Sequence, residues 1–542
     1  MKRLILRFGL VVLLCKLTVA QSLTPAEIAK IDQVFNDYAK TDSPGCSLGV
    51  YRNGVIAYEH GYGMASLELG VPITPQTVFD IGSTSKQFTA FSILLLQQQG
   101  KLSVNDDIRK FVPEMPDYGA KITLRHLMTH TSGIRDYAGL FDLAGIPEQN
   151  LTNDQDAVDL IVRQKSLNFM PGEEWDYSNS GFFLLSQVVK KVTGKTLRDF
   201  DQENIFEPLG MKSTVIFNDY SQVVPHRAIG YSFDADEKRF GVEMSNFEQT
   251  GDGSVQTSVE DLLRWDENFY TAKLGGADLI RDMQIVGKLN NGRPHTYAAG
   301  LEISNYRGQP VVSHGGAWAG YRAELMRFPQ QHTSVAVLCN AAQSAPTKRA
   351  YAVADVVLAN VLTPPANRTE KEQTSNPIST EVLKSYVGVY RSEKRGLQRV
   401  EFNDGKLSLA SYGAELIPQS SSVFTTTVAA GTISFHNKQM VIDFGGEPES
   451  YELIPTSAPK DLTRFVGDYY STELDAVWQL RIRDGQLVAQ VKHSDSPAMT
   501  LRPISEDTFM LEDGSLHFEN QTSPKRAYLT ISRIRNVEFV KN

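Results

Sequence analysis

The last third of the chain contains an internal repeat, and this repeat constrains the fold more than any other feature of the sequence. Four short segments recur in the same order, each 79 to 85 residues further along: Tyr386–Tyr390 as Phe465–Tyr469, Asp404–Leu407 as Asp484–Leu487, Pro418–Phe424 as Pro503–Phe509, and Thr432–Phe435 as Ser515–Phe518. A near-constant offset indicates two copies of one structural unit. In both copies Asp-Gly turns separate short alternating runs, which is typical of antiparallel strands. We therefore expect two all-β modules over 381–457 and 458–542, each a small barrel or half of a larger one.

The segment before the repeats, residues 21–362, mixes strand and helix patterns. A chain of 542 residues must contain several domains, because a single hydrophobic core stops growing at about 250 to 300 residues. The patterns predict a hairpin over Cys46–Gly63, helices over Gln87–Gln99, Phe182–Gly194 and Leu262–Phe269, and strands at Val311–Ser313 and Ser334–Cys339. An antiparallel sheet with helices packed on it accommodates this mixture. A polar stretch at 363–380, with prolines near both ends, is predicted to link this domain to the repeats.

The first twenty residues have the layout of a secretory signal. Basic residues precede an apolar run over Phe8–Cys15, and small residues lead to Ala20. The run is too short to span a membrane, so we expect residues 1–20 to be removed and the mature chain, without a transmembrane span, to be periplasmic or extracellular. An uncleaved N-terminal anchor is the alternative. The net charge of −9 argues against a nucleic-acid partner, which requires a basic face.

Beyond the signal the chain has two cysteines, Cys46 and Cys339, each inside an apolar run typical of a strand. Two thiols in a chain of this size do not make a disulfide framework. We therefore expect both cysteines to be buried and free rather than bridged. No Cys/His cluster in the sequence has zinc-ligand spacing, and no His-Glu-x-x-His motif occurs. We expect neither a metal ion nor another cofactor.

The sharpest chemical feature is Gly82-Ser83-Thr84-Ser85-Lys86, which opens the predicted helix Gln87–Gln99. Residues i and i+3 lie on one helix face, so the Ser83 hydroxyl and the Lys86 amine can come within hydrogen-bond distance. A serine hydroxyl becomes a useful nucleophile when a base takes its proton, and a lysine with a lowered pKa can be that base. Alone the motif is weak, because a capping serine beside a solvated lysine has the same sequence.

Two further motifs strengthen this interpretation. Tyr177-Ser178-Asn179 lies in a loop before the second predicted helix, and a tyrosine beside an ammonium group can have a lowered pKa and carry protons. His314-Gly315-Gly316-Ala317 follows a strand, and glycines at that place allow the close approach of a substrate backbone. Taken singly, the first motif is also consistent with a turn tyrosine and a capping asparagine, and the second with an ordinary strand end.

In this order, the three motifs resemble the signatures of the penicillin-recognising serine hydrolases of peptidase S12 type, a family that includes class C β-lactamases, D,D-carboxypeptidases, D-aminopeptidases and related esterases. Three flanking segments also resemble the family: Leu124–Gly133, Phe206–Met211 and Thr257–Leu262. The resemblance covers residues 24–362 and implies an α+β fold of the β-lactamase/transpeptidase type, with an antiparallel sheet flanked by helices and a helical subdomain beside it. The two repeats resemble the lipocalin-like β-barrel modules attached to D-aminopeptidases.

The resemblance implies catalytic roles for three residues of the first two motifs. Ser83 would attack a carbonyl carbon, while Lys86 and Tyr177 would share its proton and later pass it to the leaving group. The backbone N–H groups of Ser83 and Ala317 would form the oxyanion hole.

The same resemblance implies that Asn179 holds the substrate amide and that Gly315 and Gly316 bind the substrate. The resemblance also counts His314 among the catalytic residues, at the position where β-lactamases of this family usually carry lysine. A neutral imidazole is a poorer anchor for the carboxylate of a penicillin than a permanent cation. This departure favours a peptidase or an esterase over a dedicated β-lactamase.

Two other patterns are interpreted as structural. Gly45-Cys46-Ser47-Leu48-Gly49 fits the nucleophile elbow of α/β-hydrolases, but that elbow turns from strand into helix, whereas here the chain continues as a hairpin. His126 and His130 are four residues apart, and without a third ligand nearby they are expected to be packed or capping histidines.

The resemblance thus implies an exported serine hydrolase that acts through an acyl-enzyme on amide or ester bonds of small or D-residue-containing peptides. An esterase or weak β-lactamase is the alternative enzyme. A penicillin-binding sensor that is acylated without turnover is the alternative from another functional class. The expected partner is a small-molecule or peptide substrate, and the C-terminal modules are expected to shape access to Ser83 or to build a homo-oligomer.

Overall fold

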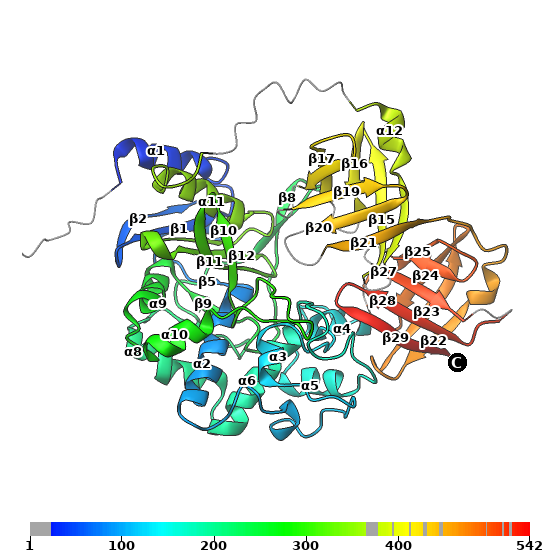
Figure 1. Cartoon of the computed structure of the whole chain (residues 1–542), viewed down its shortest axis with the longest axis horizontal. Coiled ribbons are helices and arrows are strands. Elements are labelled where there is room, and N and C mark those ends of the chain that lie inside the picture. Colours follow the sequence, from blue (N-terminus) through cyan, green and yellow to red (C-terminus); the bar gives the residue numbers. More distant parts are fainter. Residues whose placement is uncertain are drawn as a thin grey trace, which may run out of the picture.

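The structure, a computed structural model, comprises an α+β domain followed by two β-barrels (Figure 1). It describes residues 23–364, 378–392, 395–410, 414–426, 431–443, 448–494, 496–511, 514–519 and 523–542. The expected signal segment 1–20 and most of the expected linker 363–380 lie outside the described residues. Among the helices of the described ranges, none is both long enough and apolar enough to cross a membrane.

A six-stranded antiparallel sheet forms the centre of the α+β domain as described, with the strand order β10-β11-β12-β13-β1-β2. Its strands are β1 (Cys46–Arg52), β2 (Val55–Tyr62), β10 (Glu302–Tyr306), β11 (Gln309–Trp318), β12 (Tyr321–Phe328) and β13 (Thr333–Cys339). The predicted hairpin is confirmed, and its turn residues Asn53 and Gly54 both have the positive φ that a two-residue turn of type I′ requires. Ser47 lies in β1, as expected for a strand residue.

Side chains of β13 point alternately into two different cores. Val335, Val337 and Cys339 pack with α1 (Pro25–Val34) and α11 (Pro346–Val357) on one face of the sheet. Their neighbours Ala336 and Leu338 belong to the core that includes α2 (Lys86–Gln98) and α9 (Val259–Thr271). Because both faces are covered, the strand is a continuous apolar run rather than an alternating one.

Helices packed beside the sheet form the helical subdomain. With α2 they include α3 (Leu124–Met128), α4 (Tyr137–Ala144), α5 (Asp154–Val162), α6 (Asn179–Thr193) and α7 (Leu197–Asp201). The helix predicted up to Gly194 is confirmed as α6, and Gly194 adopts the left-handed conformation that commonly ends a helix. The Ser258 side chain accepts the Asp261 N–H and caps α9, so this helix starts three residues before the predicted Leu262.

Shorter elements connect these layers. They are β3 (Met64–Ser66), β4 (Val71–Pro72), β5 (Phe79–Asp80), β6 (Val215–Ile216), β7 (Tyr231–Asp234), β8 (Arg239–Val242), β9 (Val255–Thr257), α8 (Glu207–Leu209) and α10 (Gly276–Met283). The short helix α12 (Thr380–Ser385) instead precedes the first C-terminal barrel, and its Leu383 packs against the core of that barrel. The small sheet β5-β9-β6 matters for the site, because β5 leads directly to the turn that carries Ser83.

Within the described residues, each C-terminal repeat closes into its own eight-stranded antiparallel barrel, so the copies form two barrels rather than halves of one. The first contains β14 (Gly388–Ser392), β15 (Gly396–Asn403), β16 (Lys406–Leu409), β17 (Ala414–Pro418), β18 (Val423–Thr426), β19 (Thr432–His436), β20 (Gln439–Asp443) and β21 (Glu449–Ile454). The second contains β22 (Gly467–Ser471), β23 (Ala476–Arg483), β24 (Gln486–Val491), β25 (Met499–Pro503), β26 (Thr508–Met510), β27 (Gly514–Phe518), β28 (Arg526–Ile531) and β29 (Ile534–Lys541). The repeated Asp-Gly pairs at 404–405 and 484–485 form equivalent hairpin turns, and all four residues have positive φ.

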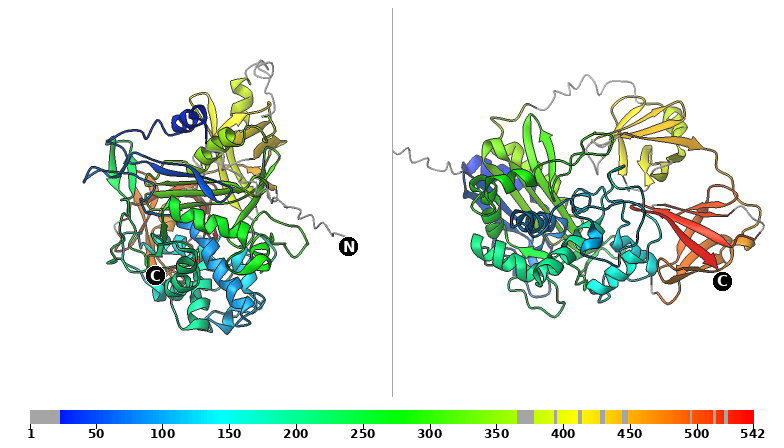
Figure 2. Two further views of the ribbon diagram at one scale, coloured as in Figure 1. Left: turned by 90° about the vertical axis from the view of Figure 1, so that its left-hand side faces the viewer. Right: turned by 60° about the horizontal axis from the view of Figure 1, so that its bottom comes forward.

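The second barrel packs directly against the helical subdomain (Figure 2). Trp478 Nε1 of β23 donates a hydrogen bond to the Leu143 carbonyl oxygen of α4 at 2.9 Å. Nearby, the buried side chains of Arg135 and Glu473 form an ion pair at 2.5 Å. Removing one partner of such a pair leaves an unpaired buried charge. The pair therefore helps to specify how the barrel and the helices meet.

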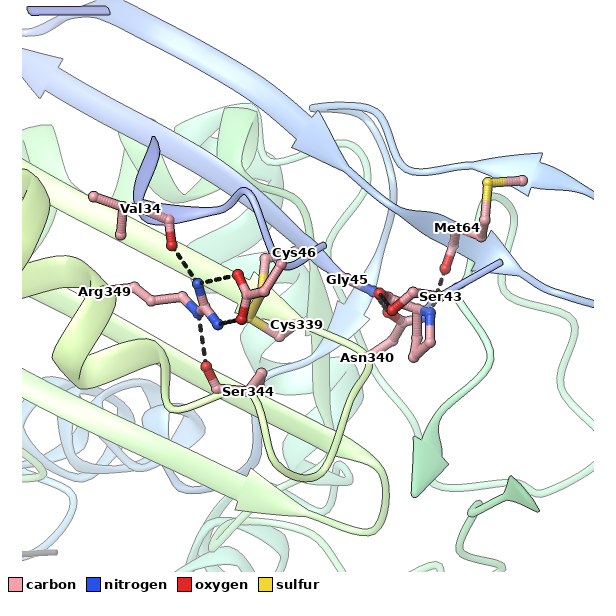
Figure 3. The surroundings of a disulfide bond; sticks show 11 residues. Val34, Ser43, Gly45, Cys46, Met64, Cys339, Asn340, Ser344 and Arg349 are labelled. Carbon is pink, nitrogen blue, oxygen red and sulfur yellow. Dashed lines mark hydrogen bonds and ion pairs between the residues drawn. A yellow bond between two sulfur atoms is a disulfide. The ribbon is translucent and has the colours of Figure 1, made fainter. Parts of the chain in front are cut away.

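The expectation of two free thiols is wrong, because Cys46 and Cys339 form a disulfide bond (Figure 3). Cys46 begins β1 and Cys339 ends β13, and the two residues are direct partners in the register of these antiparallel strands. Both side chains are fully buried. The sequence indicates that each cysteine lies in a strand, but it does not show that these two strands are neighbours, since the residues are 293 positions apart.

Replacing both cysteines, Cys46→Ala with Cys339→Ala, is expected to lower the free energy of unfolding of the α+β domain by about 2 to 4 kcal/mol, because the bond restricts the unfolded chain over a long loop. Urea unfolding followed by tryptophan fluorescence measures the change. A reductant should destabilise the wild-type protein and leave the double variant unaffected. Equal stability of wild-type and double variant under oxidising conditions would contradict the expectation.

Candidate active site

Ser83 and Lys86 lie within hydrogen-bond distance at the start of α2. Ser83 belongs to the 3₁₀ turn η1 (Gly82–Ser85), and α2 begins at Lys86. The Lys86 amine donates to Ser83 Oγ at 3.0 Å, which is the contact expected for residues three apart. A glycine is needed at position 82, because its φ is 48° and a Cβ there would lie 2.7 Å from the Ala317 amide nitrogen. This close approach places the Ser83 turn against β11.

Lys86 is completely buried, and its amine makes two further hydrogen bonds. The acceptors are Asn179 Oδ1 at 2.9 Å and the Asp252 carbonyl oxygen at 2.6 Å. Burial lowers the pKa of Lys86, while the negative charges of Asp252 and Asp136 partly oppose the shift. The amine therefore releases a proton more readily than an ordinary lysine, as a general base must.

The phenol of Tyr177 lies beside the same amine, with its ring centroid 4.9 Å from Lys86 Nζ. The expectation that the ammonium lowers the pKa of Tyr177 is wrong. Burial raises this pKa above its usual range, and the nearby Ser83 hydroxyl and Arg533 guanidinium oppose the rise only in part. Within the described residues the buried hydroxyl has no hydrogen-bond partner at good geometry. Tyr177 is thus a protonated phenol in the resting site.

His314 lies in β11 and is held as a neutral imidazole. Its Nδ1 is 2.6 Å from the Gly315 carbonyl oxygen, which can only accept, so Nδ1 carries the proton. Its Nε2 then accepts a hydrogen bond from the Tyr297 hydroxyl at 2.7 Å. Burial, helped by the charge on Lys86, lowers the pKa of His314 to about 3. The side chain therefore does not supply the positive charge that a lysine would bring to this position.

A narrow pocket opens beside Ser83. It is lined by Gly82, Ser83, Tyr137, Asn179, Phe247, Gln249, Asp252, Gly253, Ser254, Ala317 and Trp318. Ser83 and Ala317, the expected oxyanion-hole residues, thus share one pocket with Asn179. Gly315 and Gly316 are not among the lining residues. A Cβ at Gly316 would lie 1.9 Å from the Ile81 carbonyl oxygen, so this glycine instead lets β11 lie against the Ser83 turn.

Sequence reasoning missed two carboxylates beside this cluster. The Asp252 carboxylate accepts a hydrogen bond from the Tyr137 hydroxyl at 3.1 Å, and burial raises its pKa while the Lys86 charge opposes the rise. Asp136 Oδ2 accepts the Asn179 backbone N–H at 2.6 Å and so positions the first turn of α6. The available signal was position, since Asp136 and Asp252 lie a few residues from the flanking segments Leu124–Gly133 and Thr257–Leu262.

The two histidines four residues apart are a capping and a packed residue, as expected. His126 Nδ1 accepts the Thr123 N–H at 3.3 Å at the start of α3. His130 is buried with its ring centroid 4.1 Å from that of Tyr177, and its Nδ1 accepts the Ser178 N–H at 3.2 Å. His130 therefore orients the loop that carries Tyr177. In the part of the chain that the structure describes, no group of three or more His, Cys, Asp or Glu residues is arranged to hold a metal ion.

Comparison with known proteins identifies relatives that share this domain. The family model described as Beta-lactamase matches residues 31–358. The chain is 29% identical over 402 residues to a penicillin-binding protein of Bacillus subtilis (strain 168), a match that covers 70% of this chain and 88% of that protein. It is 27% identical over 448 residues to a D-aminopeptidase of Gluconobacter oxydans (strain 621H), and this match covers 81% of each chain.

A solved structure has the same fold. The octameric penicillin-binding protein homologue from Pyrococcus abyssi matches with a TM-score of 0.56 at 24% identity, covering 78% of this chain and 98% of that chain. The family match spans more than half of the chain and contains every residue of the Ser83 pocket. The chain therefore belongs to the Beta-lactamase family and is a serine hydrolase.

Proposed function

We propose that this serine hydrolase cleaves amide or ester bonds in small peptides, particularly peptides that contain D-residues, through an acyl-enzyme on Ser83. The observation that carries the proposal is the buried Lys86 amine, hydrogen-bonded to Ser83 and Asn179 beside the pocket. The relatives named D-aminopeptidase support amide cleavage next to D-residues as the reaction class.

The hydrogen bonds of Lys86 direct its lone pair at the nucleophile. Asn179 Oδ1 and the Asp252 carbonyl oxygen are acceptors, so each holds one N–H of the amine. When Lys86 is neutral, its third position carries the lone pair, which then faces Ser83 Oγ. Ser83 donates its proton to Lys86 as its oxygen bonds to the substrate carbonyl carbon.

The remaining steps need one oxyanion site and one proton donor. The backbone N–H groups of Ser83 and Ala317 would bind the oxyanion, each contributing about 3 to 4 kcal/mol of transition-state stabilisation. Because the Tyr177 phenol keeps its proton, it can protonate the leaving group and recover a proton from Lys86. Water then hydrolyses the ester on Ser83, with the Lys86 amine again acting as base.

The neutral His314 bears on the choice of substrate. The carboxylate of a penicillin would meet no permanent positive charge at this position, which favours a peptidase or esterase over a dedicated β-lactamase. An esterase or weak β-lactamase is the second candidate, and a penicillin-binding sensor that does not turn over is the third. Turnover of a D-alanyl anilide, of p-nitrophenyl butyrate and of a chromogenic cephalosporin separates these candidates.

We also propose that the chain is exported to the periplasm or the extracellular space. The Cys46–Cys339 disulfide supports this location, because such bonds persist in oxidising compartments and are rare in the cytosol. The solved homologue described as octameric supports an oligomer, and a homo-oligomer built through the barrels stays a prediction that light scattering can check.

Ser83→Ala and Lys86→Ala are each expected to lower kcat/KM for amide and ester substrates by about 10³-fold or more, because the first removes the nucleophile and the second removes its base. Mass spectrometry of the wild-type enzyme with a slow substrate should show an acyl group on the peptide that contains Ser83. Gln98→Ala, a change at an exposed position of the same helix, serves as the control. An adduct that persists in Ser83→Ala would contradict the assignment, and stoichiometric labelling without turnover would favour the sensor.

Asp252→Asn is expected to shift the rise of kcat/KM with pH toward lower pH. The base acts when it is deprotonated, so activity rises as the pH passes the pKa of Lys86. The Asp252 charge raises that pKa, and its removal therefore lowers the pKa and the midpoint of the profile.

The pH profile of kcat/KM for a neutral ester measures this shift. Asp278→Asn, which alters an exposed residue of α10, should leave the midpoint in place. A midpoint that stays unchanged or moves upward in Asp252→Asn would refute the proposed base.

A further inference from the structure

The turn between β28 and β29 brings an arginine from the second barrel to the candidate active site. These two strands lie beside α4 (Figure 1). Arg533 lies in the turn, with a φ of 63°, and its guanidinium carbon is 4.8 Å from the centroid of the Tyr177 ring. The same ring lies 4.9 Å from Lys86 Nζ. The positive charge of Arg533 also helps to lower the pKa of Lys86.

The position of this turn does not depend on the Arg533 side chain. The Arg533 carbonyl oxygen accepts hydrogen bonds from Asn168 Nδ2 at 2.7 Å and from the Asp136 N–H at 3.4 Å. Next to it, the Arg535 carbonyl oxygen accepts from the buried Arg135 side chain at 2.6 Å. These contacts, made by backbone carbonyl oxygens, hold the turn in place. The guanidinium of Arg533 takes no part in them and is available to bind a ligand.

The two arginines of this hairpin differ in their partners. Arg535 pairs with Glu174 at 3.0 Å and lies 3.7 Å from Asp176, which neutralises its charge within the protein. Arg533 is exposed, and among the described residues its guanidinium forms neither an ion pair nor a hydrogen bond. A guanidinium that rests on an aromatic ring and keeps its donors free is well suited to bind a carboxylate in a bidentate manner.

The electrostatics of the site indicate why such a charge is needed. His314 is neutral, and Lys86 must also be neutral when it acts as base. Arg533 brings a guanidinium cation to the site. It lies over Tyr177, the proposed donor to the leaving group, and therefore on the leaving-group side of the scissile bond.

We propose that Arg533 is a specificity-determining residue that binds the free C-terminal carboxylate of the leaving amino acid, so that the second barrel completes the substrate site. This inference rests on the proposed function of Ser83. The substrate class is then a short peptide whose last residue is released by hydrolysis of the final amide bond. Water supplies the hydroxyl group of the new carboxyl end, and the leaving amine takes the proton.

The test compares two matched substrates, N-acetyl-D-Ala-D-Ala with a free carboxylate and the same dipeptide with a C-terminal amide. The wild-type full-length enzyme is expected to prefer the free acid by about 10- to 100-fold in kcat/KM, as for one charge-assisted contact. Arg533→Ala should bring this ratio close to one, mainly by raising KM for the free acid. Arg533→Lys should give an intermediate ratio.

Arg483→Ala is the matched control, because Arg483 is an exposed arginine at the end of β23 whose side chain bonds to Gln490 of the same barrel. It should keep the wild-type ratio. Added salt should reduce the preference of the wild-type enzyme and have little effect on Arg533→Ala. Thermal unfolding of Arg533→Ala should match the wild type, since the backbone holds the turn.

Three results would overturn the proposal: equal rates on both substrates in the wild type, unchanged rates on both substrates in Arg533→Ala, or an equal loss on both substrates in Arg533→Ala. The last result would mean that Arg533 acts only on the proton carriers. Hydrolysis of p-nitrophenyl butyrate, which has no carboxylate, tests the catalytic role of Ser83 separately from the carboxylate-binding role of Arg533. If that hydrolysis depends on Ser83 but the preference for the free acid does not depend on Arg533, the carboxylate site is wrong and the proposed function stands. If the hydrolysis does not depend on Ser83, the proposed function is wrong.

Discussion

The buried amine of Lys86 is the point at which the active-site segments meet. Its three hydrogen-bond acceptors come from the η1 turn, the start of α6 and the loop before β9. An unpaired amine in this position would destabilise the folded state, because a buried polar group loses its hydration and, without partners, forms no hydrogen bonds that offset the loss. The same burial that requires these partners also lowers the pKa of the amine. One packing constraint thus accounts for both the geometry and the lowered pKa of the proposed base.

A second constraint connects this site to the C-terminal barrel through two adjacent residues. Arg135 forms the buried pair with Glu473, while Asp136 caps α4 and holds the Asn179 N–H. A displacement of the barrel at Glu473 would therefore also displace Arg135 and Asp136, and Asp136 is the residue that positions the backbone N–H of Asn179. The barrel is therefore part of the hydrolase structure, and the continuous apolar core between the two bodies agrees with this view. The sequence patterns of the repeats do not predict this contact between the barrel and the helical subdomain.

Much of the architecture could be predicted because it depends on local patterns. Alternating residues around Asn53-Gly54 predict the β1–β2 hairpin, and the near-constant repeat offset predicts two equal β modules. The sequence left open whether these modules close separately, since barrel closure depends on pairing between the first and last strands of each copy, β14 with β21 and β22 with β29. The resemblance to known hydrolases pointed to Ser83, Lys86, Tyr177 and Asn179 as candidate site residues, and these four lie together in the structure. Asp252 and Arg533 were not predicted, because no short motif contains them.

Local patterns along the chain were enough to predict which segments form strands and helices and that the Ser83 side chain faces Lys86, because periodicity and an i, i+3 spacing act over a few residues. The folded structure was needed to show that Cys46 is bonded to Cys339, that the phenol of Tyr177 keeps its proton, and that Arg533 lies beside the candidate site. These outcomes depend on segments far apart in the chain lying side by side. They also depend on burial, whose electrostatic effect here exceeds that of the neighbouring charges. Neither distance in space nor loss of water can be read from the order of the residues.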